Sequence, residues 1–170
     1  MSNTGFFIKY EVKDIPKKGK GIITLEGIPT GTCIWSPLLE NQRTVNKKVV
    51  EVLDEKELSN RLETMWLGDA KFLLNHIYAY EGRMFNVLGD AKFWNHSKNP
   101  NTGSLKDLAK KGIIPLSRSL DRDACFALRN IHAGEELLDN YGTYDNPDYY
   151  VQLCSKYDVE SAEIVAEKYD

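Results

Sequence analysis

The segment from Asp90 to Asn101 carries the side chains in this sequence that are best suited to hold a ligand. Two apolar residues, Phe93 and Trp94, come directly before the amide, imidazole and hydroxyl side chains of residues 95–97. Pro100 lies in the turn-forming cluster that comes next, and a regular element must stop there because proline has no backbone N–H. Such a segment can bind a polar ligand through backbone and amide groups. Taken alone, it is more typical of a capped surface loop.

The composition describes an ordinary globular protein with a slight negative charge. The chain has 170 residues, of which 42% are hydrophobic and 28% charged, and this is enough for one domain with a real core. The formal net charge of −3 argues against indiscriminate binding to nucleic acid and suits a basic partner better. We therefore predict a single domain over 1–170 that does not bind nucleic acid directly.

The cysteines and histidines form no pattern typical of a disulfide framework or a metal site. The sequence has an odd number of cysteines, and they lie far apart: Cys33, Cys125 and Cys154. This indicates buried thiols in a reducing compartment rather than disulfides. The histidines form no His-x-x-His cluster, so no structural metal is predicted. The sequence shows neither a leader segment nor a run of membrane-spanning length, and we expect an intracellular, soluble protein. The oligomeric state stays open.

Short strands separated by Gly/Pro turns are predicted for the first part of the chain. Strands are expected at 6–12, 22–25, 32–35 and 49–53, with a turn over 13–21. Asp54 and Glu57 are typical of a capping box and predict a helix to about Glu63. A second helix is expected at 69–76, followed by a hairpin of 77–80 and 83–88. These elements favour an antiparallel β architecture over a βαβ array.

The second half of the chain is predicted to hold fewer regular elements. A polar connection extends to Gly112, followed by a strand at 113–116, a charged turn at 117–123 and a strong strand at 124–128. The chain turns again at 129–134, where His132 is expected to be solvated. Pro147 suits the first turn of a helix whose apolar face holds Tyr150 and Cys154. A last helix is predicted at 160–168.

Three motifs give the sequence a resemblance to one family. They are Gly19–Ile23 with Ile28–Thr32 beyond it, Phe93–Ser97 with Pro100–Asn101, and Ala127–Leu137 ending in Tyr141–Gly142. Together they resemble, in the expected order, the opening, central and closing motifs of the SET-domain protein-lysine methyltransferases. The resemblance covers about residues 8–145.

The resemblance implies a mainly β fold with an α insert (α+β), built from small twisted sheets. It assigns about 40–88 to a variable helical insert and about 143–170 to a C-terminal helical segment. It also implies that the strand ending at Tyr141 passes under the loop after Asn95 and His96, a knot-like threading that is rare in proteins. The Cys-rich zinc segments that flank many family members are missing from this sequence.

The activity that the resemblance implies is methyl transfer from S-adenosylmethionine to the ε-amine of a lysine in a protein, with a histone tail as the leading substrate. A histone substrate would place the protein in the nucleus, and another substrate in the cytoplasm. Tyr141 is expected to be the catalytic residue and to contact the cofactor. The other expected cofactor-binding residues are Lys18, Gly19, Lys20, Gly21, Asn95 and His96.

In this family reading, a neutral lysine amine attacks the donor. With a reference pKa of about 10.4, roughly one lysine in a thousand is neutral at about pH 7.4, which corresponds to about 4 kcal/mol. A narrow apolar channel and the positive sulfonium both lower that pKa, so no carboxylate base is strictly needed. Positioning and electrostatics then supply most of the catalysis, without a metal.

One departure from the family pattern lies in the expected lysine channel. Asp139 stands two residues before Tyr141, where the family commonly has Phe or Tyr. Tyr78 and Tyr80 belong either to the core or to this channel. Tyr144 and its neighbours 149 and 150 either pack the C-terminal helix or supply a ring that stacks on adenine. Asp139 also leaves open a SET fold that recognises a peptide without turnover, and a non-histone substrate is a third alternative.

Overall fold

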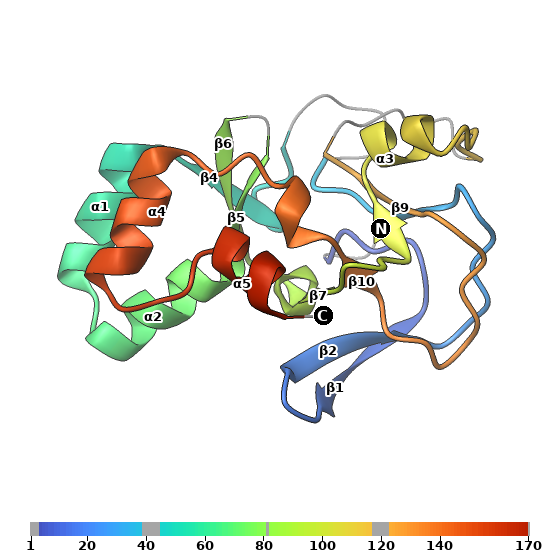
Figure 1. Ribbon diagram of the computed structural model, residues 1–170, viewed down its shortest axis with the longest axis horizontal. Helices are drawn as coiled ribbons and strands as arrows, with labels where there is room; N and C mark the ends of the chain where they lie inside the picture. The colour runs from blue at the N-terminus through green and yellow to red at the C-terminus, as the bar shows by residue number, and fades with distance from the viewer. Residues whose placement is uncertain (1–3, 39–44, 81, 117–122, 170) are drawn as a thin grey trace.

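A computed structural model describes residues 4–38, 45–80, 82–116 and 123–169, apart from the side chains of Tyr80 and Arg83. Four small sheets and five α-helices make up this part of the chain (Figure 1). Three sheets are antiparallel, and the fourth is a two-strand parallel pair. The mainly β, α+β fold expected from the sequence is confirmed.

An antiparallel hairpin of β1 (Tyr10–Ile15) and β2 (Gly19–Thr24) opens the fold. The turn predicted over 13–21 is shorter in the structure. Backbone pairing extends to Ile15 in β1 and resumes at Gly19 in β2, so only residues 16–18 form the turn. The turn uses the left-handed backbone region at Lys17, with φ of 68°. Lys18 is therefore the last residue of the turn, and Gly19 to Gly21 belong to β2.

A second sheet has the strand order β3 (Cys33–Trp35), β9 (Cys125–Ala127) and β8 (Thr102–Gly103). Helix α3 (Leu105–Lys110) packs on it through the buried Leu108, and it begins with a capping box formed by Ser104 and Asp107. This helix was not predicted, because the segment was expected to be a polar connection. The strand predicted at 113–116 was wrong: its backbone forms no strand, and Ile114 is exposed.

The insert between the first and second motifs holds the sheet β4 (Val50–Leu53), β6 (Arg83–Val87) and β5 (Ile77–Tyr80), in that order. The predicted hairpin of β5 and β6 is confirmed. Helix α1 (Glu55–Thr64) begins at the predicted capping box, in which Asp54 and Glu57 bond to each other's backbone N–H. Helix α2 (Leu67–His76) leads directly into β5.

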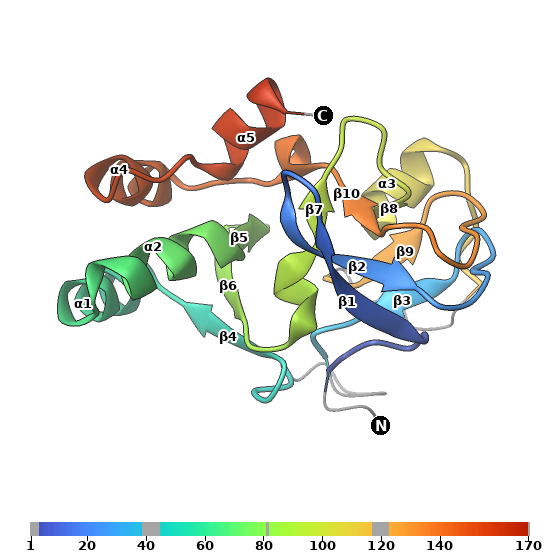
Figure 2. The same cartoon turned by 90° about the horizontal axis from the view of Figure 1, so that it is seen from below.

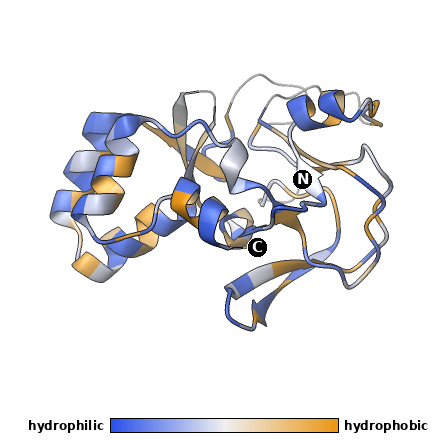
Figure 3. Ribbon diagram, viewed as in Figure 1, coloured by the Kyte–Doolittle hydropathy of each residue, from blue (hydrophilic) through white to orange (hydrophobic). Residues whose placement is uncertain are grey.

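Helices α1, α2 and α4 (Asp148–Lys156) gather at one end of the molecule, away from the β1–β2 hairpin (Figures 1 and 2). Hydrophobic and hydrophilic positions alternate along these helices (Figure 3), and the apolar ones form a common core. The fully buried Leu58, Leu74 and Tyr150 belong to this core. The helix predicted from Pro147 is thus confirmed, and α5 (Ala162–Lys168) follows it.

The main core joins the sheets to the segment around Trp94. Its buried members include Ile22 from β2, Ile34 from β3, Phe85 from β6, and Leu137. Leu137 lies just before β10 (Leu138–Asp139), which pairs in parallel with β7 (Asn95–His96). The short 3-10 helix η1 (Asp90–Phe93) precedes β7, and a second one, η2 (Tyr141–Thr143), follows β10. None of the helices in the described ranges is long and apolar enough to cross a bilayer.

Candidate active site

The parallel pair of β7 and β10 brings the second and third sequence motifs together. Leu138 lies opposite Asn95, and Asp139 lies opposite His96. The backbone N–H of Ser97 continues the pairing by donating to the Asp139 carbonyl oxygen at 2.9 Å. The adjacency that the sequence analysis expected between the strand ending at Tyr141 and the Asn95–His96 segment is therefore present.

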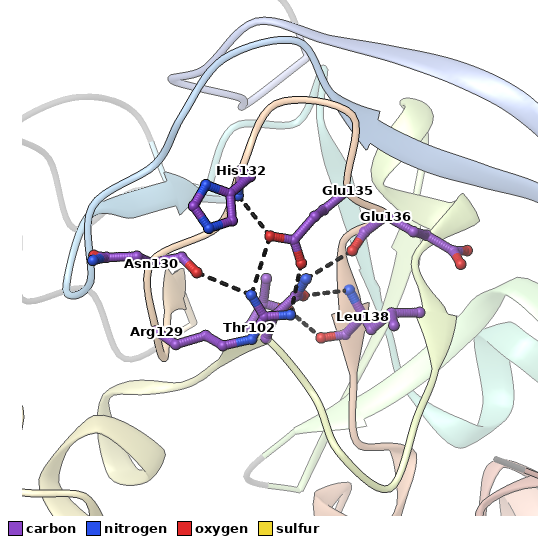
Figure 4. Close-up of polar contacts among 8 residues, drawn as sticks. Thr102, Arg129, Asn130, His132, Glu135, Glu136 and Leu138 are labelled. Atoms are coloured by element: carbon purple, nitrogen blue, oxygen red, sulfur yellow. Dashed lines mark hydrogen bonds and ion pairs between the residues drawn. The ribbon is translucent and has the colours of Figure 1, made fainter.

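Two buried polar side chains hold β10 in place. The Asn101 amide donates to the Glu136 carbonyl oxygen at 2.7 Å and accepts from the Leu138 N–H at 2.8 Å. Thr102 donates to the Leu138 carbonyl oxygen at 2.7 Å (Figure 4). It also accepts from the Trp94 indole N–H at 3.0 Å. These bonds satisfy the edge groups of a two-residue strand, which is too short to be stable by pairing alone.

The turn before β10 is closed by an ion pair. The Arg129 guanidinium donates to both carboxylate oxygens of Glu135, at 3.2 and 2.7 Å, and the backbone N–H of His132 donates to the same carboxylate at 2.6 Å (Figure 4). The His132 residue is exposed, as the sequence predicted. This bidentate pair fixes the direction in which the chain enters the site.

Tyr141 is bound to the second motif at both ends. Its backbone N–H donates to Nδ1 of His96 at 3.1 Å, and its hydroxyl donates to the Trp94 carbonyl oxygen at 2.5 Å. Its ring also lies 5.2 Å from the His96 ring. Burial, and secondarily the nearby Asp139, raise the pKa of the Tyr141 hydroxyl above its usual value. The hydroxyl is therefore a neutral group in a fixed position.

Asn95 connects this pair of strands to the hairpin. Its side-chain amide donates to the Lys20 carbonyl oxygen at 3.0 Å and to Oε1 of Glu136 at 2.7 Å. The other oxygen of Glu136 lies 3.6 Å from Nζ of Lys18. The Lys20 ammonium instead pairs with Asp14 at 3.4 Å and is exposed. Asn95 and Lys18 therefore converge on Glu136, a residue to which the sequence analysis gave no role.

The two glycines of the first motif have different surroundings. A Cβ on Gly21 would lie 2.5 Å from Oε1 of Glu136 and 3.0 Å from Nδ2 of Asn95. Gly19 has φ of +79°, a region that favours glycine, and a Cβ there would meet nothing within 4 Å. The close approach at Gly21 is thus made by the protein's own side chains, whereas Gly19 borders open space.

A cavity of about 130 Å³ lies beside Tyr141. Its lining includes three residues that the sequence assigned to the channel or to catalysis, namely Tyr78, Asp139 and Tyr141. Asn95 and the segment 18–21 do not line it. The candidate site therefore has two parts. One is the polar cluster beside β2 and β7, formed by Lys18, Lys20, Asn95 and Glu136. The other is the aromatic cavity, and Tyr141 lies between the two parts. The side chain of Tyr80 lies outside the described part of the chain.

Tyr144 completes the aromatic wall of the cavity. Its ring lies 5.3 Å from that of Tyr141 and 5.5 Å from that of Tyr78. The sequence analysis left its place open, because the chain reverses at η2 and spacing along the sequence cannot show which way the ring then faces. Tyr150 also borders the cavity, but it is 2% exposed and packs in the helical core, where its hydroxyl donates to the Leu74 carbonyl oxygen.

Asp139 presents a carboxylate to the same cavity. Its Oδ2 accepts from the Tyr144 hydroxyl at 3.1 Å, and its Oδ1 accepts from the Asn140 N–H at 2.7 Å. Burial raises the pKa of Asp139 to about 6, although these two bonds oppose the rise. The carboxylate is thus ionised near neutral pH and protonated slightly below it. Among the described residues, no group of three or more His, Cys, Asp or Glu is placed to hold a metal ion.

The parallel pairing that brings Tyr141 beside Asn95 and His96 is the arrangement that the resemblance to the SET-domain protein-lysine methyltransferases implied. The family model described as "SET domain" matches residues 19–142, and the chain belongs to this family. SET methyltransferases use S-adenosylmethionine as the methyl donor.

The similar proteins carry the same class name. The chain is 28% identical over 135 residues to "Histone-lysine N-methyltransferase, H3 lysine-37 specific" of Schizosaccharomyces pombe, covering 79% of this chain and 74% of that protein. It is 34% identical over 146 residues to "Histone-lysine N-methyltransferase set5" of the same organism, covering 78% of this chain but only 41% of that protein.

A solved structure shows the same fold. The methyltransferase domain of human histone-lysine N-methyltransferase SETMAR is 25% identical, with a TM-score of 0.51. The similarity covers 83% of this chain and 47% of that one, so the chain spans about half of the SETMAR domain structure.

Proposed function

We propose that this protein transfers a methyl group from S-adenosylmethionine to the ε-amine of a lysine in a histone tail. The observation that carries the proposal is the position of Tyr141, whose hydroxyl is held by the Trp94 carbonyl oxygen at the wall of the aromatic cavity. The names of the two yeast relatives support a histone substrate, and the net charge of −3 suits a basic peptide. A histone substrate implies a nuclear protein.

The polar cluster on β2 and β7 has the chemistry needed for the donor's methionine end, which carries a carboxylate and an ammonium. Lys18 supplies a cation and Glu136 an anion, 3.6 Å apart, and the Asn95 amide lies between them and the backbone of Lys20. Gly19 leaves open space beside this cluster. The backbone of His96 is proposed to contact the adenine edge.

When bound, S-adenosylmethionine supplies an electrophilic methyl group on a sulfonium. Tyr141 then orients the reacting groups, because its hydroxyl is fixed by Trp94 and its backbone by His96. A neutral hydroxyl at this point holds the methyl group and the incoming amine in line, and such positioning contributes much of the rate of a transfer reaction. Lys18, Gly19, Lys20, Gly21, Asn95 and His96 are proposed to hold the donor.

The rings of Tyr78, Tyr141 and Tyr144 form the proposed lysine channel. Its rings are proposed to limit the access of water to the reacting amine, and its apolar walls favour the neutral form of the lysine. Tyr80 remains a proposed channel residue from the sequence. Asp139 lines the same channel, and its carboxylate favours the charged form of the lysine instead.

A transfer assay tests the proposal. The protein is incubated with tritium-labelled S-adenosylmethionine and core histones, alongside Tyr141→Phe and a matched control, Tyr169→Phe, which changes an exposed tyrosine. We expect label on a histone with the unaltered protein and the control, and a loss of at least about 100-fold with Tyr141→Phe.

Other results identify the alternatives. Label on other proteins of a cell lysate, with none on histones, would replace the histone by another protein substrate. Binding of the donor without transfer to any lysine, equally in the unaltered protein and in Tyr141→Phe, would show a recognition module without turnover. Failure to bind the donor would reject the proposal.

A further inference from the structure

Asp139 lines the cavity to which the proposed function assigns the target lysine. Asp139 lines the cavity together with Tyr141, two residues later, and Tyr144, whose hydroxyl donates to its Oδ2. Each carboxylate oxygen accepts one bond within the described part of the chain, from Tyr144 or from the Asn140 N–H. A carboxylate oxygen can accept about two hydrogen bonds, so each oxygen has capacity for one donor from a ligand.

Many other titratable groups line this cavity or the strand paired with Asp139. Asp107 of α3 and Cys125 of β9 are near enough to interact with it electrostatically, and both also line the cavity. Burial raises the pKa of Cys125 well above its usual value, so this thiol carries no charge there. The other titratable residues of the cavity lining or the paired strand are His76, Tyr78, Lys92, His96, Asp123, Tyr141, Tyr144, Tyr150 and Glu160.

Aromatic faces and a carboxylate together favour a cation. The rings of Tyr78, Tyr141 and Tyr144 lie side by side along one wall, and an ammonium placed over such faces is attracted by them. An ionised Asp139 on the same wall favours the charged form of a bound amine. A cavity with these walls therefore admits lysine as the ammonium, whereas methyl transfer requires the neutral amine.

We propose that Asp139 accepts the proton of the target lysine inside this cavity, an inference that rests on the proposed function. The Nε–H bond of the ammonium breaks, its electron pair stays on nitrogen, and a new O–H bond forms on Asp139. The products are a neutral amine and a carboxylic acid. The amine then forms its bond to the donor methyl as the C–S bond breaks and the sulfonium becomes a thioether. The proton leaves Asp139 for solvent after the product departs.

The acid–base behaviour of Asp139 is consistent with this role. Burial raises its pKa to about 6, so at neutral pH the group is ionised and still a stronger base than an ordinary aspartate. Its bonds to Tyr144 and Asn140 hold the carboxylate in one orientation. Asp139 is thus held in one orientation and is ionised at neutral pH, so it can accept a proton.

The pH dependence of kcat/KM tests the proposal. With the unaltered protein and a lysine peptide we expect a rise around pH 6 and a plateau above it. Asp139→Asn keeps the size and one acceptor oxygen; it should lose about 100-fold at neutral pH and recover about tenfold per pH unit as lysine deprotonates in solution. The exposed Asp145→Asn is the control and should keep the plateau. A plateau retained by Asp139→Asn would overturn the proposal.

Two further measurements cover the case in which Asp139→Asn is unstable. Tyr144→Phe removes a bond that lowers the pKa of Asp139, so the rise of kcat/KM should move to higher pH. A peptide carrying thialysine, a less basic amine, should reduce the loss caused by Asp139→Asn. An unmoved rise in Tyr144→Phe, or an equal loss on both amines, would contradict proton transfer to Asp139.

A binding experiment separates this inference from the proposed function. n-Butylammonium has the shape of a lysine side chain, and n-butanol is its neutral counterpart. Titrated into the protein and followed by NMR, the cation should bind at least tenfold more tightly, and Asp139→Asn should abolish that preference. If the preference is present but no methyl transfer occurs with any substrate, the proposed function fails while the cation site stands. If transfer occurs without the preference, Asp139 does not receive the lysine.

Discussion

The backbone N–H of Tyr141 donates to Nδ1 of His96 at 3.1 Å, although the two residues are 45 positions apart in sequence. Because Nδ1 acts as an acceptor, the His96 ring in its neutral form carries its proton on Nε2. The same tyrosine reaches the Trp94 carbonyl oxygen with its hydroxyl. One residue thus joins the third motif to the second through both its backbone and its side chain.

Tyr141→Phe should affect catalysis far more than folding. The change removes one hydrogen bond, to Trp94, and leaves the backbone bond to His96 in place. We expect the free energy of unfolding to fall by about 1 kcal/mol, the usual contribution of such a bond. Urea denaturation at neutral pH measures this, with Tyr169→Phe as the control. A loss of more than about 4 kcal/mol would show that the hydroxyl is chiefly structural.

The two-part site depends on Gly21, the buried glycine of the first motif. In Gly21→Ala the new Cβ would lie 2.5 Å from Oε1 of Glu136 and 2.6 Å from Cγ1 of Ile15. Glu136 must then move away from Asn95, so we expect a loss of about 1–3 kcal/mol in stability and weaker donor binding.

Gly68→Ala is the matched control for this change. Gly68 lies in α2, and a Cβ there would meet nothing within 4 Å. Alanine at such a helix position should stabilise the protein by about 0.5–1 kcal/mol and leave donor binding unchanged. Thermal unfolding and calorimetric titration with S-adenosylmethionine measure both effects. Equal behaviour of the two variants would show that the contact with Glu136 is unimportant.

The sequence predicted the parts of the fold that neighbouring residues determine. The Asp54 capping box and the hairpin of β5 and β6 depend on neighbouring residues, and both are where the pattern placed them. The resemblance to the SET family also implied that Asn95–His96 and Tyr141 would lie together, and they do. Helix α3 was missed because its capping box, Ser104 with Asp107, lies in a polar segment with one buried leucine.

The contacts that could not be predicted cross between elements. Tyr144 bonds to Asp139 only because η2 reverses the chain between them. Glu136 contacts Asn95 and Lys18 because it bridges to Ile23 of β2 and leads into β10, which lies beside β7. Spacing along the sequence contains no signal for either contact. The motif located Glu136, but its role becomes visible only in three dimensions.

Asn95→Asp should weaken donor binding through charge. The new carboxylate would lie where Nδ2 now donates to Oε1 of Glu136 at 2.7 Å, so two like charges would face each other. It would also lose the bond to the Lys20 carbonyl oxygen. We expect about tenfold weaker binding of S-adenosylmethionine at pH 8 by calorimetry, equivalent to about 1.4 kcal/mol.

Lower pH should partly restore binding by this variant, because protonation of the new carboxylate at position 95 removes the repulsion. Asn99→Asp makes the same chemical change at an exposed position and should bind the donor normally. A variant Asn95→Asp that binds the donor as well as the control does would exclude Asn95 from the donor site.

The ion pair at the turn before β10 should contribute to stability above acidic pH. Hydrogen bonds from Arg129, and then the N–H of His132, hold the pKa of Glu135 below its usual value. The folded state therefore favours the ionised carboxylate, and this contribution is present at neutral pH and lost as the pH falls through the lowered pKa. Glu135→Gln should reduce the free energy of unfolding by less than about 1 kcal/mol at pH 7, because the pair is partly exposed. In urea titrations the difference should vanish near pH 3, and a difference of equal size at both pH values would contradict the ionic origin.

Asp139 should have the opposite effect on stability. Its pKa in the folded protein is raised to about 6, so folding favours the protonated carboxyl. The folded state binds more protons than the unfolded chain between the two pKa values, and its stability falls as the pH rises through this interval. The ionised carboxylate then costs at most about 3 kcal/mol above pH 6, by the conversion of about 1.4 kcal/mol per pKa unit.

Asp139→Asn should therefore be more stable than the unaltered protein at pH 8 while being less active. Its amide cannot ionise, and the Tyr144 hydroxyl can either donate to it or accept from it. The stability difference should shrink as the pH falls toward 4, where the native carboxyl is protonated, and Asp145→Asn should show no such trend. Urea denaturation of the three proteins between pH 4 and 8 measures this. A variant Asp139→Asn that is less stable by the same amount at every pH would mean that Asp139 supports the fold rather than the transfer of a proton.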